Sequence, residues 1–299
     1  MKGNIIVPSW DLVTNASVIK KFNFIPSFLS TLYLSIVVLY QIAFTYVYIF
    51  NLKDEFFSWA IQIVHEGYVI EILIGFGMLL FIYIFLTPIS EGGMICLIDG
   101  FYKKDGNKYK VSYGLSRGLL NFWPIFELHN FMALFKLLSI VTAYIFCLRI
   151  FGEDYAVTIS VIFFIYLIFS LIMNILFAYS KFFIIFEEKG VFEAASLSTR
   201  MTLNNMGVTG KLYFTLFLVY IRVVLTIIMF LIFPLLASLV FAYISSQFFF
   251  IFWITLIILI FIVFLLFITH FNSVLEIFID GLWYNAYTEN RKTFEMEEK

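Results

Sequence analysis

Charged residues are scarce in this chain, and their scarcity excludes most classes of soluble protein. Asp, Glu, Lys and Arg make up 13% of the 299 residues, against roughly 25% in soluble domains, while 63% of the residues are hydrophobic. A soluble domain of this length could not cover its surface with so few polar side chains. The composition therefore predicts an integral membrane protein, and runs long enough for membrane-crossing helices place it in the all-α class.

Cysteine and histidine are also rare, which removes the usual basis for a disulfide framework or a metal site. Cys96 and Cys147 fall near opposite ends of the predicted membrane traverse, so a bond between them is not expected. His65, His129 and His270 are far apart and form no HExxH motif, and no phosphate-binding or nucleophile motif occurs. We therefore predict no enzymatic activity, no cofactor and no bound metal.

Long apolar runs, by contrast, are abundant. A helix rises about 1.5 Å per residue and needs about 20 apolar residues to cross about 30 Å of hydrocarbon. Six runs reach this length, and the mixed region 1–27 before them lacks the cleavage pattern of a removable signal peptide. The predicted spans are 28–50, 67–89, 131–151, 155–180, 212–240 and 247–270.

Basic residues predict how these spans are oriented. Fifteen of the nineteen lysines and arginines fall on the side of the N-terminus, and only Lys53 and Arg149 fall on the other side. Positive residues concentrate in the cytoplasm, so both termini are predicted there, in a multi-pass protein of the cell inner membrane. The same residues predict attraction to the anionic lipid headgroups of the bilayer, and nucleic acid is not a predicted partner.

A short pattern occurs three times, each time just before a predicted span. A basic residue is followed by an asparagine and, three residues after it, by a proline or a glycine. The copies contain Asn23 with Pro26, Asn121 with Pro124, and Asn204 with Gly207. Asparagine tolerates the left-handed conformation that closes a helix, and proline is favoured in the first turn of the next helix. We interpret the pattern as a structural corner where a surface helix turns into the bilayer; the alternative is coincidence between similar segments.

The corners predict a threefold repeat within one integral membrane domain of residues 1–299. Each unit contains a cytoplasmic interfacial helix, a span, a short external link and a returning span, so the six transmembrane helices form three repeated hairpins. The units cover approximately 10–89, 105–180 and 190–275, with a cytoplasmic tail at 281–299.

Local patterns support this layout at the ends of the spans. Polar turn clusters at 103–108 and 187–190 predict helical hairpins. The triplet Ile98-Asp99-Gly100 after the second span recurs as Ile279-Asp280-Gly281 after the sixth. The interfacial helix of the second unit is predicted from an apolar stripe formed by Val111, Leu115, Leu119, Phe122 and Phe126.

Aligning the three copies on their asparagines brings polar residues inside the membrane to equivalent positions. The shifts are 98 from residue 23 to residue 121 and 83 from residue 121 to residue 204. The aligned residues are Gln41, Ser139 and Arg222. Arg222 falls near the middle of the bilayer, where an unpaired cation costs about 2.5–3.5 kcal/mol. We predict that the three residues line a polar cavity that binds an anionic group; the alternative is an arginine paired within the protein.

The segment before the third corner carries a resemblance to known proteins. It is rich in small residues, as in Ala194-Ala195-Ser196-Leu197-Ser198, and leads through Asn204 into a span. This arrangement resembles multi-pass bacterial families grouped with the membrane domain of glycerophosphodiester phosphodiesterases. The resemblance covers roughly residues 10–285 and implies the six-span layout. It transfers no site residue, because no phosphodiesterase catalytic domain is present.

Two functions of different classes fit these observations. The first is a transporter, channel or lipid-handling protein with a polar cavity around Arg222. The second is a non-catalytic membrane scaffold that docks a protein partner through the cytoplasmic segments 90–130 and 181–211. The substitution Arg222→Leu separates them, because it removes ligand binding only from the first.

Overall fold

The computed structural model describes residues 5–49, 52–65, 67, 69–217 and 247–297, and these ranges contain helices and turns but no strand. The predicted all-α class is therefore confirmed. The labelled helices are α1 (Ile6–Asn15), α2 (Ser17–Ile49), α3 (Lys53–Val64), α4 (Val69–Tyr102), α5 (Val111–Leu120), α6 (Phe122–Ala133), α7 (Leu137–Phe151), α8 (Ala156–Leu176), α9 (Ser180–Glu187), α10 (Val191–Asn204) and α12 (Gln247–Glu297). A short 3-10 helix, Glu153–Tyr155, joins α7 to α8, and a further helix covers 206–217.

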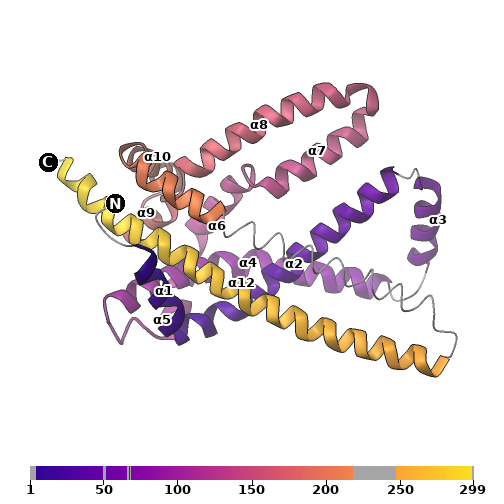
Figure 1. The fold of residues 1–299 in the computed structure, drawn as a ribbon, viewed down its shortest axis with the longest axis horizontal. Helices are drawn as coiled ribbons and strands as arrows, with labels where there is room; N and C mark the ends of the chain where they lie inside the picture. Colours follow the sequence, from indigo (N-terminus) through magenta and orange to yellow (C-terminus); the bar gives the residue numbers. More distant parts are fainter. Residues whose placement is uncertain (1–4, 50–51, 66, 68, 218–246, 298–299) are drawn as a thin grey trace.

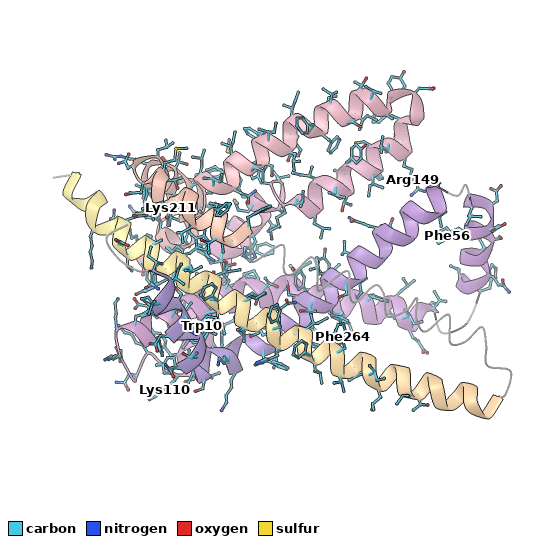
Figure 2. All side chains as sticks on the ribbon, viewed as in Figure 1. Trp10, Phe56, Lys110, Arg149, Lys211 and Phe264 are labelled. Atoms are coloured by element: carbon cyan, nitrogen blue, oxygen red, sulfur yellow. The ribbon has the colours of Figure 1, made fainter. Side chains whose placement is uncertain are left out.

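Two groups of long helices diverge from a common end of the molecule (Figure 1). One group is the α7–α8 pair, and the other contains α2, α4 and α12. The shorter helices α5, α6, α9 and α10 gather at the common end, where α1 and the C-terminal part of α12 also lie. In Figure 2, Trp10, Lys110 and Lys211 lie around this common end, whereas Phe56 and Arg149 lie at the far ends of the long helices.

Three described stretches are long and apolar enough to cross a membrane, as an integral membrane protein requires. They are Val69–Tyr102, Ala156–Glu187 and Ile262–Lys292. A fourth is added if the pair Phe122–Ala133 and Leu137–Phe151, bent by 45°, is one broken span. The first predicted span lies in α2, which is not among these stretches, and the fifth lies mostly outside the described residues. Six spans in three hairpins therefore remain a prediction.

Helices α4 and α5 pack backbone against backbone through glycines. A Cβ atom added to Gly93 would lie 2.4 Å from the carbonyl oxygen of Gly114, and one added to Gly118 would lie 2.1 Å from that of Ile89. Small residues four apart let two helices approach this closely. The contact fixes which face of α4 is turned away from α5, and that face carries Glu91.

Residues with left-handed backbones close two helical hairpins, α4–α5 and α9–α10. Lys104 and Glu188 both have φ of 53°. The carboxylate of Asp105 accepts hydrogen bonds from the backbone nitrogens of Asn107 at 3.1 Å and Lys108 at 3.4 Å, which stabilises the first turn. The two polar turn clusters therefore lie at turns between helices, as their composition predicts.

The corner predicted at Asn23 and Pro26 is wrong, because both residues lie inside α2. The helix break comes earlier, at Ala16 between α1 and α2, where φ is −84° and ψ is 66°. Proline lacks a backbone donor, but membrane helices tolerate it when neighbouring groups satisfy the freed carbonyl. The Asn23 side chain does not cap a helix end and instead reaches sideways towards α12.

The other two copies of the pattern do lie at helix boundaries. Asn121 separates α5 from α6 with φ of −91° and ψ of 5°, and Pro124 falls in the first turn of α6. Asn204 is the last residue of α10, and Asn205 forms the turn before the helix that contains Gly207. Neither Asn121 nor Asn205, whose φ is −122°, is left-handed, so the expected closing conformation is not used.

The predicted tail at 281–299 is helical over its described part, because α12 continues through it to Glu297. Leu282 and Ala286 are fully buried and Asn290 is 3% exposed, which shows that residues four apart form a packed face. The Asn290 side chain donates a hydrogen bond of 3.1 Å to the hydroxyl of Tyr179. The mixed charges on the outer face of this part of α12 favoured the interpretation as a tail, and the packed inner face was not predicted.

Candidate functional site

The structure describes two of the three residues predicted to line a polar cavity, Gln41 and Ser139. Arg222 lies outside the described residues. Nε2 of Gln41 donates a hydrogen bond of 2.6 Å to Oγ1 of Thr142, which joins α2 to α7 next to a small cavity of about 60 Å³. Ser139 is exposed one turn before Thr142 and lines neither this cavity nor the larger one below. Gln41 therefore contacts the helix that carries Ser139, about one turn beyond that residue.

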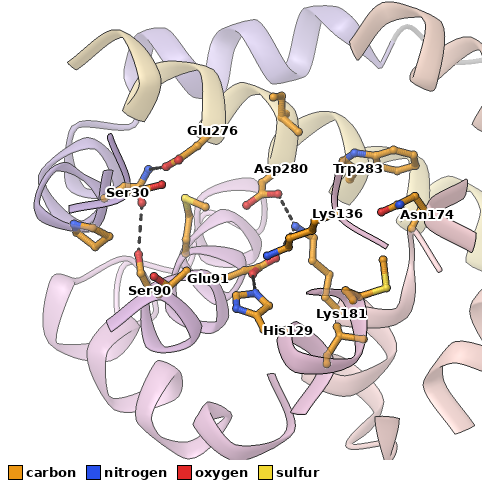
Figure 3. Close-up of a pocket in the computed structure, with 18 of the residues that line it drawn as sticks. Ser30, Ser90, Glu91, His129, Lys136, Asn174, Lys181, Glu276, Asp280 and Trp283 are labelled. Carbon is orange, nitrogen blue, oxygen red and sulfur yellow. Dashed lines mark hydrogen bonds and ion pairs between the residues drawn. The ribbon is translucent and has the colours of Figure 1, made fainter. Parts of the chain in front are cut away.

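A larger polar cavity, of about 490 Å³, lies at the common end of the long helices (Figure 3). Its walls are formed by α2, α4, α6, α8, α9, α12 and the helix that covers 206–217. Its acidic and basic lining residues are Glu91, His129, Lys136, Lys181, Glu276 and Asp280. The volume falls within the range of roughly 300–1,000 Å³ that is usual for small-molecule sites.

Lys181 is the centre of an ion-pair cluster that joins three helices. Its Nζ atom lies 2.9 Å from Oε1 of Glu91 on α4 and 2.6 Å from Oδ1 of Asp280 on α12. The exposed fractions of the Lys181, Glu91 and Asp280 side chains are 17%, 23% and 8%. Charges so far removed from water must be paired, because desolvation costs several kcal/mol for each ion.

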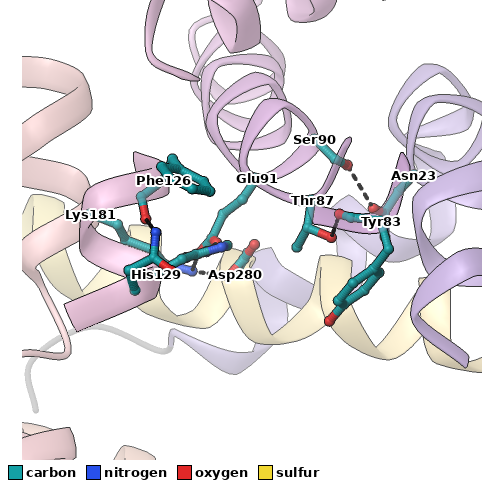
Figure 4. Close-up of polar contacts among 10 residues, drawn as sticks. Asn23, Tyr83, Thr87, Ser90, Glu91, Phe126, His129, Lys181 and Asp280 are labelled. Carbon is teal, nitrogen blue, oxygen red and sulfur yellow. Dashed lines mark hydrogen bonds and ion pairs between the residues drawn. The ribbon is translucent and has the colours of Figure 1, made fainter. Parts of the chain in front are cut away.

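His129 extends this cluster to α6. Its Nε2 atom contacts Oε2 of Glu91, the carboxylate oxygen that Lys181 does not contact (Figure 4). Both oxygens of Glu91 are thus occupied by basic groups. The cluster holds α4, α6, α9 and α12 in a fixed arrangement along one wall of the cavity.

Glu276 is held in a different way, by neutral donors. Its Oε2 atom accepts hydrogen bonds of 2.8 Å from Nδ2 of Asn23 and 2.6 Å from Oγ of Ser27. Oδ1 of Asn23 in turn accepts a hydrogen bond of 3.3 Å from Oγ of Ser90, which is drawn in Figure 4. Asn23, predicted as a corner, therefore links α2 to α4 and α12 at the cavity wall.

The sequence contains a signal that points to these charged residues. Glu91 is the first charged residue after Glu71, Lys181 the first after Asp154, and Glu276 the first after Arg222. A charge that directly follows an apolar run lies at the end of a membrane traverse, where returning helices meet. In the sequence, Lys181 counts only as one of the fifteen basic residues on the side of the N-terminus, and Asp280 only as part of a repeated triplet.

The cavity can bind and orient a polar group, because its walls carry both basic hydrogen-bond donors and acidic hydrogen-bond acceptors. Within the described ranges, no group of three or more His, Cys, Asp or Glu residues is placed to hold a metal ion. No protein-family model matches the chain, and neither a curated protein nor a solved structure matches it. The resemblance to the phosphodiesterase membrane domain therefore remains a prediction.

Proposed function

We propose that the protein is a membrane carrier or lipid-handling protein that holds the polar part of its ligand in the cavity around Lys181. The observation that carries this proposal is an enclosure of about 490 Å³ with acidic and basic walls, built where long apolar helices meet. A purely structural ion-pair cluster needs no such volume, because protein interiors that serve only stability are close-packed.

The apolar surroundings favour a ligand that comes from the membrane. On α4, Ile70 and Leu73 are 69% and 64% exposed, and on α8, Val157 and Phe164 are 78% and 63% exposed. Such side chains are stable in contact with lipid and not with water. An amphiphile fits this setting, with its polar group in the cavity and its tail along the apolar helices.

We place the cavity in a six-span protein of the cell inner membrane, at the cytoplasmic end of three hairpins. Helix α5 supports a surface position at that end, because Val111, Leu115 and Leu119 of its apolar stripe are 45%, 46% and 56% exposed. An amphipathic helix of this kind lies in the headgroup region of the bilayer. Basic residues at the same end favour anionic headgroups.

Filling the cavity tests the proposed function. Ala178 and Ser30 line the cavity, so Ala178→Phe and Ser30→Phe are expected to displace a ligand. We expect each variant to lose roughly tenfold in the amount of lipid retained by the purified protein, measured by native mass spectrometry. Transfer of a fluorescent phospholipid across vesicles of phosphatidylethanolamine and phosphatidylglycerol should fall in parallel.

The matched control is Val157→Phe, which adds the same side chain on the exposed face of α8. This variant should retain lipid and transfer it as the wild type does. Wild-type retention and transfer by both folded blocking variants would contradict the proposed function.

A further inference from the structure

One acidic group in the cavity has acceptor capacity that the protein does not use. Oε2 of Glu276 receives both hydrogen bonds, from Asn23 and Ser27, and Oε1 accepts none from the described part of the chain. No lysine, arginine or histidine within the described ranges forms an ion pair with this carboxylate. A carboxylate that has only neutral partners favours a cationic donor at its free oxygen.

One basic side chain in the cavity, that of Lys136, has no acidic partner within the described part of the chain. Lys136 lies at the bend between α6 and α7, where its backbone is extended, and its side chain lines the cavity. It forms no ion pair with any residue that the structure describes. Figure 3 shows Lys136 and Glu276 entering the cavity from different elements.

The other charges along the walls are already paired with one another. The lining contains three carboxylates, those of Glu91, Glu276 and Asp280, and two ammonium groups, those of Lys136 and Lys181. His129 contacts Oε2 of Glu91, and Lys181 contacts both Glu91 and Asp280. These four residues therefore bind one another, and the carboxylate of Glu276 and the ammonium of Lys136 remain for a ligand.

We propose that the cavity recognises a zwitterionic group that carries an ammonium and a phosphate, as phosphoethanolamine does. The ligand ammonium donates to Oε1 of Glu276, and the ligand phosphate accepts from Nζ of Lys136. This assignment rests on the proposed function, and it names the ligand class for the same cavity. The group has two sources, the headgroup of phosphatidylethanolamine or the free solute.

The first test compares ligands on the wild-type protein. The purified full-length chain in detergent is titrated with O-phosphoethanolamine, with inorganic phosphate and with ethanolamine, and thermal stabilisation is recorded. Short-chain phosphatidylethanolamine and phosphatidylglycerol form the lipid arm. We expect at least one ammonium-bearing phosphate to bind on the order of tenfold more tightly than its partner without the ammonium group. Equal binding of ligands with and without the ammonium group, in both arms, would overturn the assignment.

The second test removes the two charges of Glu276 and Lys136, one at a time. Glu276→Gln is expected to remove the preference for the ammonium group while phosphate binding persists, and Lys136→Gln is expected to weaken every phosphate-bearing ligand. Each loss should be on the order of tenfold. Exposed Glu127→Gln and Lys110→Gln are the matched controls and should bind as the wild type does.

The outcomes separate this inference from the proposed function. If Ala178→Phe abolishes binding but Glu276→Gln and Lys136→Gln leave the preference intact, the zwitterion assignment fails and the cavity function stands. If Ala178→Phe and Ser30→Phe both bind normally, both fail. Stabilisation by the lipid alone identifies the headgroup as the source, and equal stabilisation by free O-phosphoethanolamine identifies the solute; either result supports the shared chemistry.

Discussion

Replacing Lys181 with methionine is expected to lower the free energy of unfolding by about 3–5 kcal/mol. The substitution leaves the carboxylates of Glu91 and Asp280 without the cation that lies 2.9 Å and 2.6 Å from them. Methionine has a similar length and no charge, so little of the loss comes from altered packing. Thermal and denaturant unfolding of the purified protein in detergent measure the change.

Two further variants show whether the loss comes from unpaired buried charge. Lys189 forms a pair of 2.6 Å with Glu193, but these side chains are 36% and 56% exposed, so Lys189→Met should change stability little. Combining Lys181→Met with Glu91→Gln and Asp280→Asn removes all three charges and should restore most of the lost stability. A Lys181→Met protein as stable as the Lys189→Met control would show that the cluster does not hold the helices together.

Alanine at Gly118 or Gly93 is expected to produce the second large effect. The new Cβ atoms would lie 2.1 Å from the carbonyl oxygen of Ile89 and 2.4 Å from that of Gly114. Backbone atoms cannot move aside as the end of a flexible side chain does, so α4 and α5 must separate. Overpacking typically costs about 1–3 kcal/mol, and we expect values at or above the upper end of this range.

Gly75→Ala is the matched control, because it lies on α4 and a Cβ atom there would meet nothing within 4 Å. This variant should unfold at the wild-type temperature. The same separation of α4 from α5 would shift Glu91, so Gly93→Ala should also weaken ligand binding. Three alanine variants of equal stability would contradict the close packing of these two helices.

Features that depend on neighbouring residues were predictable from the sequence. The apolar runs set the all-α class, and the turns at 103–108 and 187–190 follow from polar residues that favour tight backbone conformations. The exposed stripe of α5 follows from helical periodicity. The boundary at Asn121 was also found, although its backbone conformation differs from the expected one.

Features that depend on distant residues were not predictable in this way. The residues around Pro26 are typical of a helix start, but neighbouring helices allow α2 to continue through this proline. The candidate site draws on seven helices, and the alignment of repeat copies compares positions along the chain without specifying which faces meet. It therefore found Gln41 and α7 but not Thr142, and it did not find the cavity around Lys181.

The hydrogen bonds of α12 also have a consequence for the order in which the helices of this protein are completed during synthesis. Asn23 is bonded to Glu276, 253 residues later, and Lys181 to Asp280, 99 residues later. Until α12 is translated and inserted, Lys181 lacks one of its two carboxylate partners and Asn23 lacks its bond to Glu276. A nascent chain that stops before α12 therefore has incomplete polar contacts at the Lys181 and Asn23 side chains. Insertion of α12 is thus the step that completes the polar contacts of the earlier helices.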